Sequence, residues 1–209
     1  MRTISERGTL WELAVLSLVR EEPMHPYQML QWLRERHKDD VLDLKRGSLY
    51  HAIDRLCRQG LIEPAGTGRD GRRPERTVYR LTPEGRRRFL ERLRTWIAVP
   101  RRAPSEFMGS LSFLVHLAPA DAAARLEARA AAVERESAAL AAGLEQAREF
   151  VDPINLIESD YQLAMLQSEL LWIRGALRTM RSGRLNWNFQ KIIRQARARR
   201  HRPKLNPHP

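Results

Sequence analysis

The chain has 209 residues, of which 43% are hydrophobic, so it can form one or two domains with cores of their own and is not a disordered polypeptide. Its single cysteine excludes an intramolecular disulfide framework, and its histidines show no zinc-ligand spacing, so we expect no metal and no other cofactor. No segment has the apolar character of a signal peptide or the length of a membrane span, and we expect a soluble, cytoplasmic protein without a membrane partner.

The net charge of +12 is unevenly distributed along the chain. Residues 1–100 hold 20 Lys or Arg against 14 Asp or Glu, residues 101–181 hold 9 against 11, and residues 182–209 hold 8 against none. A general excess of arginine would make all three segments basic, yet the middle segment is slightly acidic. The two basic ends therefore favour nucleic acid as the partner.

Two helices are predicted at the start of the chain. Thr9 and Glu12 have the spacing of a capping box, and the nearly continuous apolar run 10–19 predicts a central core helix that ends near 21–23. Proline is favoured in the first turn of a helix, so Pro26 predicts the start of the second helix.

The segment 45–62 predicts a third helix with two different faces. Apolar residues recur at helical spacing and form one stripe: Leu49, Ala52, Ile53 and Leu56. The residues off this stripe are aromatic or cationic: Tyr50, His51, Arg55 and Arg58. We expect Ser48 to cap the helix and Gly60 to end it. A packed helix with a basic and aromatic outer face is typical of a nucleic-acid reader.

A β-hairpin is predicted after this helix. Residues 61–65 and 76–81 are strand candidates, and the segment 66–74 between them is rich in glycine and arginine and contains an Asp-Gly turn signal. Three helices followed by a two-stranded hairpin is the order of a winged helix-turn-helix DNA-binding domain. A fourth helix over 82–97 completes this domain, which we place at residues 1–99.

The proline-containing segment 100–104 separates a second domain, which we place at residues 105–181. Its first helix is predicted from Phe107 and stops at Pro119. Heptad-like apolar positions then predict a long helix: Leu126, Val133, Leu140, Leu144 and Val151. After Pro153 a second long helix is apolar on more than one face, so one face can pack on the preceding helix while the other needs a partner. We expect an antiparallel helical dimerisation domain, and thus a chain that is mainly α with a small β-hairpin.

Residues 182–209 form a basic tail. Its first part carries aromatic and aliphatic residues: Trp187, Phe189, Ile192 and Ile193. We expect this amphipathic part to dock on the body of the protein and the arginine-rich remainder to act as a sequence-independent basic arm.

Several short motifs occur in an order known from one protein family: residues 13–18, His25-Pro26-Tyr27, Gly47-Ser48-Leu49-Tyr50, Gly60-Leu61-Ile62, Gly71-Arg72-Arg73-Pro74 and residues 79–85. Over residues 9–95 the chain resembles the PadR family of bacterial transcriptional regulators, and its C-terminal half is similar to the longer PadR subclass. The resemblance implies a homodimeric winged-helix repressor of DNA transcription, sometimes released by a small molecule. Pro26 stands where the family commonly has glycine, Arg73 is an additional wing arginine, and the tail after Met180 is outside the family pattern.

The candidate DNA-binding residues lie on the second and third helices and in the hairpin. Hydroxyl groups at a helix N-terminus favour phosphate, and arginine can bond guanine in a bidentate manner for about 1–3 kcal/mol of discrimination. The alternatives are a half-buried core position for Tyr50, a solvated surface position for His51, an ion pair with a carboxylate for Arg55, and a solvated charge run for the wing arginines. Lys45 and Arg46 are favoured as contacts to the DNA backbone. The candidates are Tyr27, Lys45, Arg46, Ser48, Tyr50, His51, Arg55, Arg69, Arg72, Arg73 and Arg76.

Other residues suggest further hypotheses. Trp11, Phe89 and Trp96 are candidates for binding a planar small-molecule effector. Cys57 lies near the apolar stripe, which favours a buried structural thiol over a redox sensor. The sequence has no phosphate-binding glycine loop, no nucleophile elbow and no metalloprotease motif, so we do not expect an enzyme. The expected partners are double-stranded operator DNA with an inverted repeat, a second copy of the chain and possible effectors. The alternative is a winged-helix RNA-binding or protein-interaction module without operator specificity.

Overall fold

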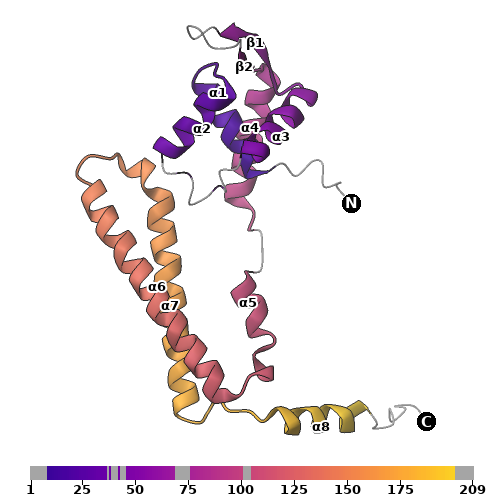
Figure 1. Cartoon of the computed structure of the whole chain (residues 1–209), viewed down its shortest axis with the longest axis vertical. Helices are drawn as coiled ribbons and strands as arrows, with labels where there is room; N and C mark the ends of the chain where they lie inside the picture. Colours follow the sequence, from indigo (N-terminus) through magenta and orange to yellow (C-terminus); the bar gives the residue numbers. More distant parts are fainter. Residues whose placement is uncertain are drawn as a thin grey trace. The chain divides into compact units, whose positions relative to one another are not determined.

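The chain divides into two compact units, Met1–Arg102 and Ala103–Pro209, which are described separately below (Figure 1). This computed structural model describes residues 9–36, 38, 42, 46–68, 76–100 and 105–200. Among these residues no helix is both long enough and apolar enough to cross a membrane.

The first unit has the predicted order of three helices, a hairpin and a fourth helix. Its elements are α1 (Leu10–Glu21), α2 (Pro26–Glu35), α3 (Arg46–Arg58), β1 (Ile62–Gly68), β2 (Arg76–Leu81) and α4 (Pro83–Ala98). The two strands are antiparallel, and the register shifts between Pro64 and Gly66. Gly66 has a φ of 130°, a conformation that glycine adopts without steric cost, and such a bulge bends the strand. The winged-helix arrangement is confirmed.

The predicted signals at the starts of α1 and α2 are confirmed. The Thr9 hydroxyl accepts a hydrogen bond from the Glu12 amide at 3.2 Å, and the Glu12 carboxylate accepts one from the Thr9 amide at 3.3 Å. At α2, which begins at Pro26, His25 Nδ1 accepts a hydrogen bond from the Gln28 amide at 3.1 Å. Side chains thus satisfy amide groups that have no partner within either helix.

Helix α3 ends as predicted but begins earlier than predicted. Gly60 has a φ of 67°, its amide donates to the Cys57 carbonyl at 2.9 Å, and the Leu61 amide donates to the Leu56 carbonyl at 2.9 Å. These two bonds form a Schellman motif, which ends the helix at a left-handed glycine. The expectation that Ser48 caps α3 is wrong, because the helix already begins at Arg46 and Ser48 lies within its first turn.

The core of the first unit fixes the orientation of α3. Its apolar stripe is buried, with exposures of 0% for Leu49, Ala52 and Leu56 and 3% for Ile53. This stripe packs in one cluster with residues of α1, α2, β1 and α4. Because the stripe is fully enclosed, the opposite side of α3 must face outward.

The turn after α3 is packed tightly against the start of α4. The Thr82 hydroxyl donates to the Gly60 carbonyl at 2.8 Å and accepts from the Gly85 amide at 2.9 Å. A Cβ atom at Gly85 would lie only 1.9 Å from the Leu61 carbonyl oxygen, so only glycine fits there. This close packing fixes the hairpin relative to α3.

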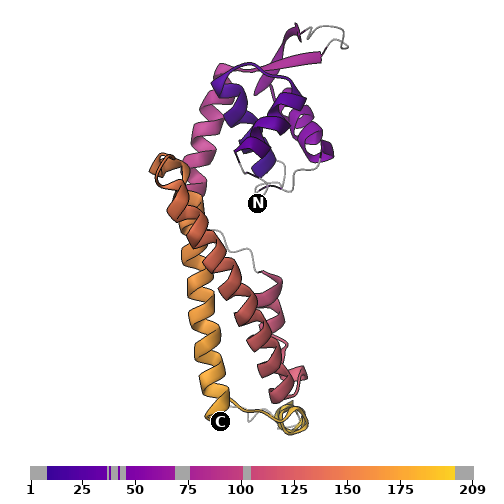
Figure 2. The same cartoon turned by 60° about the vertical axis from the view of Figure 1, so that its left-hand side comes forward.

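The second unit is built around two long helices that lie side by side as an antiparallel hairpin (Figure 2). Its elements are α5 (Glu106–Leu111), the 3₁₀ turns η3 (Leu114–His116) and η4 (Pro153–Asn155), α6 (Pro119–Ala147), α7 (Ile157–Arg181) and α8 (Phe189–Arg200). The continuous helix expected from Phe107 to Pro119 is interrupted after Leu111. Gly109 and the serines beside it have low helix propensity, which accounts for the break.

Apolar contacts and ion pairs join α6 to α7. The predicted heptad positions Leu126, Val133 and Leu144 are buried on α6, as are Ile173 and Leu177 on α7. Arginines pair across the two helices in three places: Arg129–Glu169 at 2.5 Å, Arg174–Glu134 at 2.6 Å and Arg181–Glu127 at 2.8 Å. The charges of this hairpin are therefore largely compensated within it.

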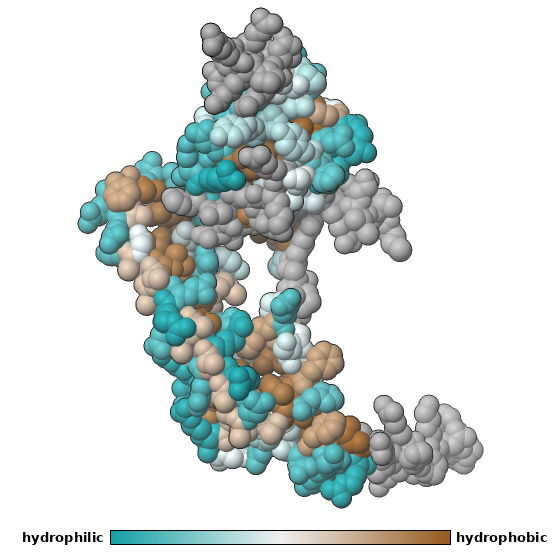
Figure 3. Space-filling view, viewed as in Figure 1, coloured by the Kyte–Doolittle hydropathy of each residue, from teal (hydrophilic) through white to brown (hydrophobic). Residues whose placement is uncertain are grey.

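A stripe of large apolar side chains on α7 is not covered by α6. Its members are Ile157 (62% exposed), Tyr161 (69%), Met165 (52%), Leu171 (69%) and Trp172 (49%). Apolar side chains are also visible at the surface around the turn between α6 and α7 (Figure 3). Such an uncovered stripe is typical of a surface that packs against another protein.

Candidate nucleic-acid interface

The outer face of α3 presents an aromatic side chain and an imidazole. Tyr50 is 55% exposed and His51 is exposed, whereas Leu49 and Ala52 on the opposite face are fully buried. The alternative of a half-buried core tyrosine is therefore disfavoured for Tyr50. Ser48, which lies three residues before His51 on the same helix, is partly exposed.

The structure brings Tyr50 together with Tyr27 at one groove. The groove has a volume of ≈ 330 Å³ and opens between α2, α3 and β2. Its lining residues are His25, Pro26, Tyr27, Leu30, Tyr50, Thr77 and Tyr79. The sequence prediction included only the two tyrosines of the helices; Tyr79 was visible as part of a motif but had no assigned role.

Tyr79 links the hairpin to the helices at this groove. Its amide donates to the Met24 carbonyl at 3.0 Å, and its carbonyl accepts from the Met24 amide at 3.1 Å. Burial raises the pKa of the Tyr79 phenol, with smaller contributions from Cys57 and Tyr50, so the phenol keeps its proton at neutral pH. Protonated phenols can donate hydrogen bonds to phosphate oxygens, and their rings can pack on sugars and thymine methyl groups.

Arg55 is held in an ion pair inside the domain. Its Nε lies 2.6 Å from Glu12 Oε1, and its Nη2 donates to the Thr9 hydroxyl at 3.3 Å. The other Glu12 oxygen pairs with Arg92 Nη1 at 3.0 Å, and the Glu12 side chain is 3% exposed. This geometry is the ion-pair alternative considered from the sequence, and it joins α1, α3 and α4. Base contact by Arg55 stays a prediction.

The other described arginines near α3 and the hairpin also have acidic partners. Arg58 pairs with Asp54 at 2.6 Å and Arg80 with Glu63 at 2.8 Å, and all four side chains are largely exposed. Exposed pairs contribute little and rearrange readily, so these arginines can turn to a phosphate. Six predicted DNA contacts stay predictions, because either the whole residue or its side chain lies outside the part of the chain that the structure describes: Lys45, Arg46, Arg69, Arg72, Arg73 and Arg76.

The predicted effector residues lie on α1 and α4, which pack together. Trp11 is partly buried against the core, Phe89 is 6% exposed and Trp96 is partly buried. The Arg20 guanidinium lies 5.7 Å from the centre of the Phe89 ring. Effector binding at these aromatic residues stays a prediction.

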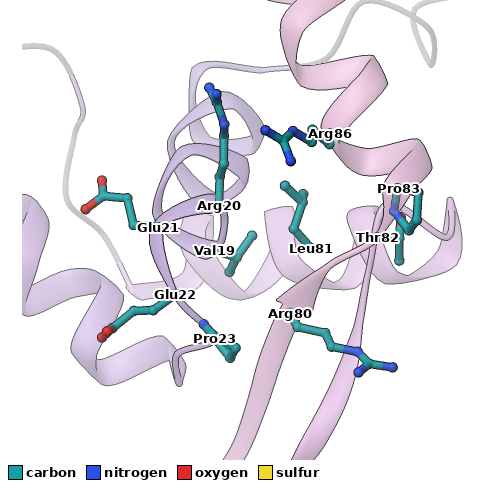
Figure 4. Close-up of a pocket in the computed structure, with 10 residues that line it drawn as sticks. All are labelled: Val19, Arg20, Glu21, Glu22, Pro23, Arg80, Leu81, Thr82, Pro83 and Arg86. Atoms are coloured by element: carbon teal, nitrogen blue, oxygen red, sulfur yellow. The ribbon is translucent and has the colours of Figure 1, made fainter.

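A second cavity, which no sequence motif indicates, lies next to Arg20 (Figure 4). It has a volume of ≈ 450 Å³ and is lined by Val19, Arg20, Glu21, Glu22, Pro23, Arg80, Leu81, Thr82, Pro83 and Arg86. Figure 4 shows Arg86 extending toward Arg20, while Glu21 and Glu22 point away from both. Neither of these two arginines pairs with a carboxylate among the described residues, whereas Glu21 is occupied by Arg36 at 2.6 Å. The cavity is therefore suited to a small anion.

The two cavities open on opposite faces of the hairpin. Tyr79 lines the groove beside α3, and its neighbour Arg80 lines the cavity beside Arg20. Successive residues of a strand project to opposite faces of the sheet. A ligand in the second cavity would therefore leave the outer face of α3 uncovered.

Cys57 is partly buried beside the core, in agreement with the expected structural thiol. Burial raises the pKa of the Cys57 thiol, and the nearby Asp54 carboxylate adds to this effect. A raised pKa lowers the thiolate fraction at neutral pH, which favours a structural thiol over a redox sensor.

Comparison with known proteins gives a family match within the first unit and solved structures of similar fold. Residues 15–91 match the sequence profile described as "Transcriptional regulator PadR-like family". PadR of Bacillus subtilis in complex with operator DNA is similar over 82% of this chain and 99% of that chain, with 19% identity and a TM-score of 0.62. The same protein with p-coumaric acid gives 18% identity and a TM-score of 0.63 over the same shares. The PadR-like regulator BC1756 of Bacillus cereus gives 17% identity and a TM-score of 0.55, over 83% of this chain and 99% of that chain. The comparison with curated proteins gives no match.

Proposed function

We propose that this chain, whose residues 15–91 match the PadR-like family of transcriptional regulators, represses transcription by binding operator DNA as a homodimer. The observation that carries the proposal is the orientation of α3. Its apolar stripe is enclosed in the core, and Tyr50 and His51 face outward beside the tyrosine-lined groove. The DNA complex of the Bacillus subtilis protein, which has a similar fold, supports the same partner.

Duplex DNA suits this surface better than RNA does. The major groove of B-form DNA admits an α-helix, whereas the major groove of an RNA duplex is too deep and narrow for side chains to read. In a winged helix-turn-helix the recognition helix enters the major groove, and the hairpin contacts the backbone beside it. Tyr50 and His51 in the N-terminal half of α3, together with Tyr27 of α2, then contact the DNA.

The uncovered stripe of α7 supports a dimer. A second copy that packs the same stripe against Tyr161, Leu171 and their neighbours would bury side chains that are now half to two-thirds exposed. Such a self-complementary contact generates two-fold symmetry. A symmetric dimer reads an inverted repeat, with half-sites separated by about one helical turn or a multiple of it.

The second cavity supports release by a small anionic effector. A carboxylate between Arg20 and Arg86 would neutralise two guanidinium groups that converge without an acidic partner among the described residues (Figure 4). Arg20 also contacts Phe89 of the core, so a ligand there can shift α4 relative to α1. The p-coumaric acid complex of the Bacillus subtilis protein makes an aromatic carboxylate a reasonable first probe.

DNA binding is tested by fluorescence anisotropy with a duplex from upstream of the chain's own gene, and with an RNA duplex of the same sequence as competitor. Tyr50→Ala together with His51→Ala should weaken binding to the DNA by at least about tenfold, since each well-formed contact is worth about 1–3 kcal/mol. Gln31→Ala, on the exposed side of α2, serves as the control. Equal affinity of both variants, or preference for RNA, would refute the assignment of α3.

The effector cavity is tested by titrating p-coumarate and following tryptophan fluorescence and release of the DNA. Arg86→Gln should abolish the response while leaving DNA binding without ligand unchanged. Arg88→Gln, two residues further along α4 and paired with Glu84, is the matched control. A response that survives in Arg86→Gln would show that the effector binds elsewhere.

A further inference from the structure

The C-terminal segment has a charge imbalance that the rest of its unit lacks. Residues 182–209 contain eight basic residues and no acidic residue. On α6 and α7, arginines pair with carboxylates of the facing helix, as Arg174 does with Glu134. On α8, Lys191 and Arg194 are exposed and form no ion pair with any residue that the structure describes. Their charges therefore remain available to an external anion.

The start of α8 is attached to the body of the second unit. The Trp187 indole donates a hydrogen bond to the Leu117 carbonyl at 2.9 Å, and the Phe189 ring lies 4.9 Å from the His116 ring. The Asn188 side chain accepts from the Lys191 amide at 3.0 Å and caps the helix. This confirms the expected docking of the amphipathic part, and it holds the basic helix at a defined place within its unit.

The apolar side of α8 argues against a membrane surface. An interfacial membrane helix inserts a free apolar face into the lipid. Here Phe189 is partly buried by its contact with His116, and Ile193 is also partly buried. The apolar side therefore serves in part to dock the helix, and the exposed residues between Lys191 and Arg194 include only one large apolar side chain, Ile192 at 37%.

Duplex DNA is the polyanion that the same chain would bind through its winged-helix unit. Once one part of the chain has bound the DNA, a second binding segment of the same chain is present at a high effective concentration, so even weak phosphate contacts by that segment add affinity. A helix of 12 residues is about 18 Å long, and duplex DNA carries one charge per about 1.7 Å of its axis. Helix α8 is thus long enough to lie along several phosphates.

We propose that α8 is a second DNA contact, which binds phosphates of the duplex without sequence preference. This inference rests on the DNA binding proposed for the winged-helix unit. It assigns a function to a segment that lies outside the part of the chain matched by the family profile, and it predicts additional affinity for any DNA sequence rather than additional specificity.

The test compares two double variants of the full chain, each of which removes two charges. Lys191→Gln with Arg194→Gln neutralises α8, and Arg135→Gln with Arg178→Gln neutralises two exposed arginines of α6 and α7 as the control. DNA affinity is measured by anisotropy between about 50 and 200 mM salt, with the operator and with a duplex of arbitrary sequence. Circular dichroism and thermal unfolding establish that both variants fold.

Each lost phosphate contact lowers the slope of log K against log salt by about 0.9, so the α8 variant should lose about 1.8 per chain. When the salt concentration rises fourfold, both proteins lose DNA affinity. The factor by which the α8 variant loses affinity should be about 12-fold smaller, per chain, than the factor for the wild type. The control should keep the wild-type slope. The proposal is overturned if both variants keep that slope, or if the α8 variant instead loses binding to phosphatidylglycerol vesicles. A wild-type chain that binds no DNA would refute the proposed function itself.

Discussion

Glu12 is the residue whose replacement tests the internal architecture of the winged-helix unit most directly. Its carboxylate is 3% exposed and accepts hydrogen bonds from Arg55 at 2.6 Å and from Arg92 at 3.0 Å. Glu12→Gln keeps the size of the side chain but removes the charge and replaces one acceptor oxygen with an NH₂ donor. One of the two guanidinium groups would then face a donor instead of a carboxylate.

The expected cost follows from the burial of the three side chains. Removing one partner of a buried ion pair costs about 3–5 kcal/mol, because the remaining charge is buried without compensation. Arg92 is 13% exposed and fits this case, whereas Arg55 is 38% exposed and can be rehydrated. We therefore expect Glu12→Gln to lower the free energy of unfolding by about 2–4 kcal/mol.

Urea unfolding followed by tryptophan fluorescence measures this change, with Glu63→Gln as the control. Glu63 pairs with Arg80, but the two side chains are 47% and 58% exposed, so the control should cost no more than about 1 kcal/mol. Equal costs for the two variants would refute the reasoning. Arg55→Gln extends the test: it should lower stability because it removes the ion pair with Glu12, and its effect on base preference tests the predicted base contact separately. If it relaxes base preference at unchanged stability, Arg55 reads the DNA instead.

Three further predictions concern packing, thiol chemistry and assembly. Gly85→Ala should destabilise the winged-helix unit by about 3 kcal/mol or more in a thermal unfolding assay, because its Cβ would overlap the Leu61 carbonyl. Gly143→Ala on α6 is the control: a Cβ there meets open space, so this variant should stabilise its helix by up to about 1 kcal/mol. Alkylation of Cys57 by iodoacetamide should be slow at neutral pH and rise only at higher pH than for a free thiol, since its pKa is raised; an unshifted pH profile would contradict this. Leu171→Glu should convert the dimer to a monomer in light scattering, because the side chain is 69% exposed in the single chain and its replacement leaves the helix itself intact; a variant that remains dimeric would move the interface elsewhere.

Local signals allowed much of the fold to be predicted. The Thr9–Glu12 capping box and the left-handed Gly60 depend on residues close together in the sequence, and both are present in the structure. The apolar stripe of α3 likewise determined which side of that helix is buried. The error at Ser48 came from the same local reasoning, because a serine inside the first turn of a helix resembles one at its cap.

Contacts between distant residues could not be predicted. Arg55 lies off the apolar stripe, which is compatible with a base contact or with an ion pair, but the sequence does not indicate its partner Glu12, which is 43 residues away. The convergence of Arg20 and Arg86 also depends on how α1 and α4 pack, and no spacing in the sequence indicates it. Tyr27 and Tyr50 were predicted separately, and only the tertiary structure places them in one groove.

A footprint on the DNA upstream of the chain's own gene is the most direct test of the central claim. Two protected half-sites of an inverted repeat, with centres about one helical turn or a multiple of it apart, are the predicted result, because a two-fold dimer presents two copies of α3. The protection should be lost with Tyr50→Ala and His51→Ala. Uniform or absent protection, at concentrations where the chain is folded and dimeric, would contradict sequence-specific reading by α3.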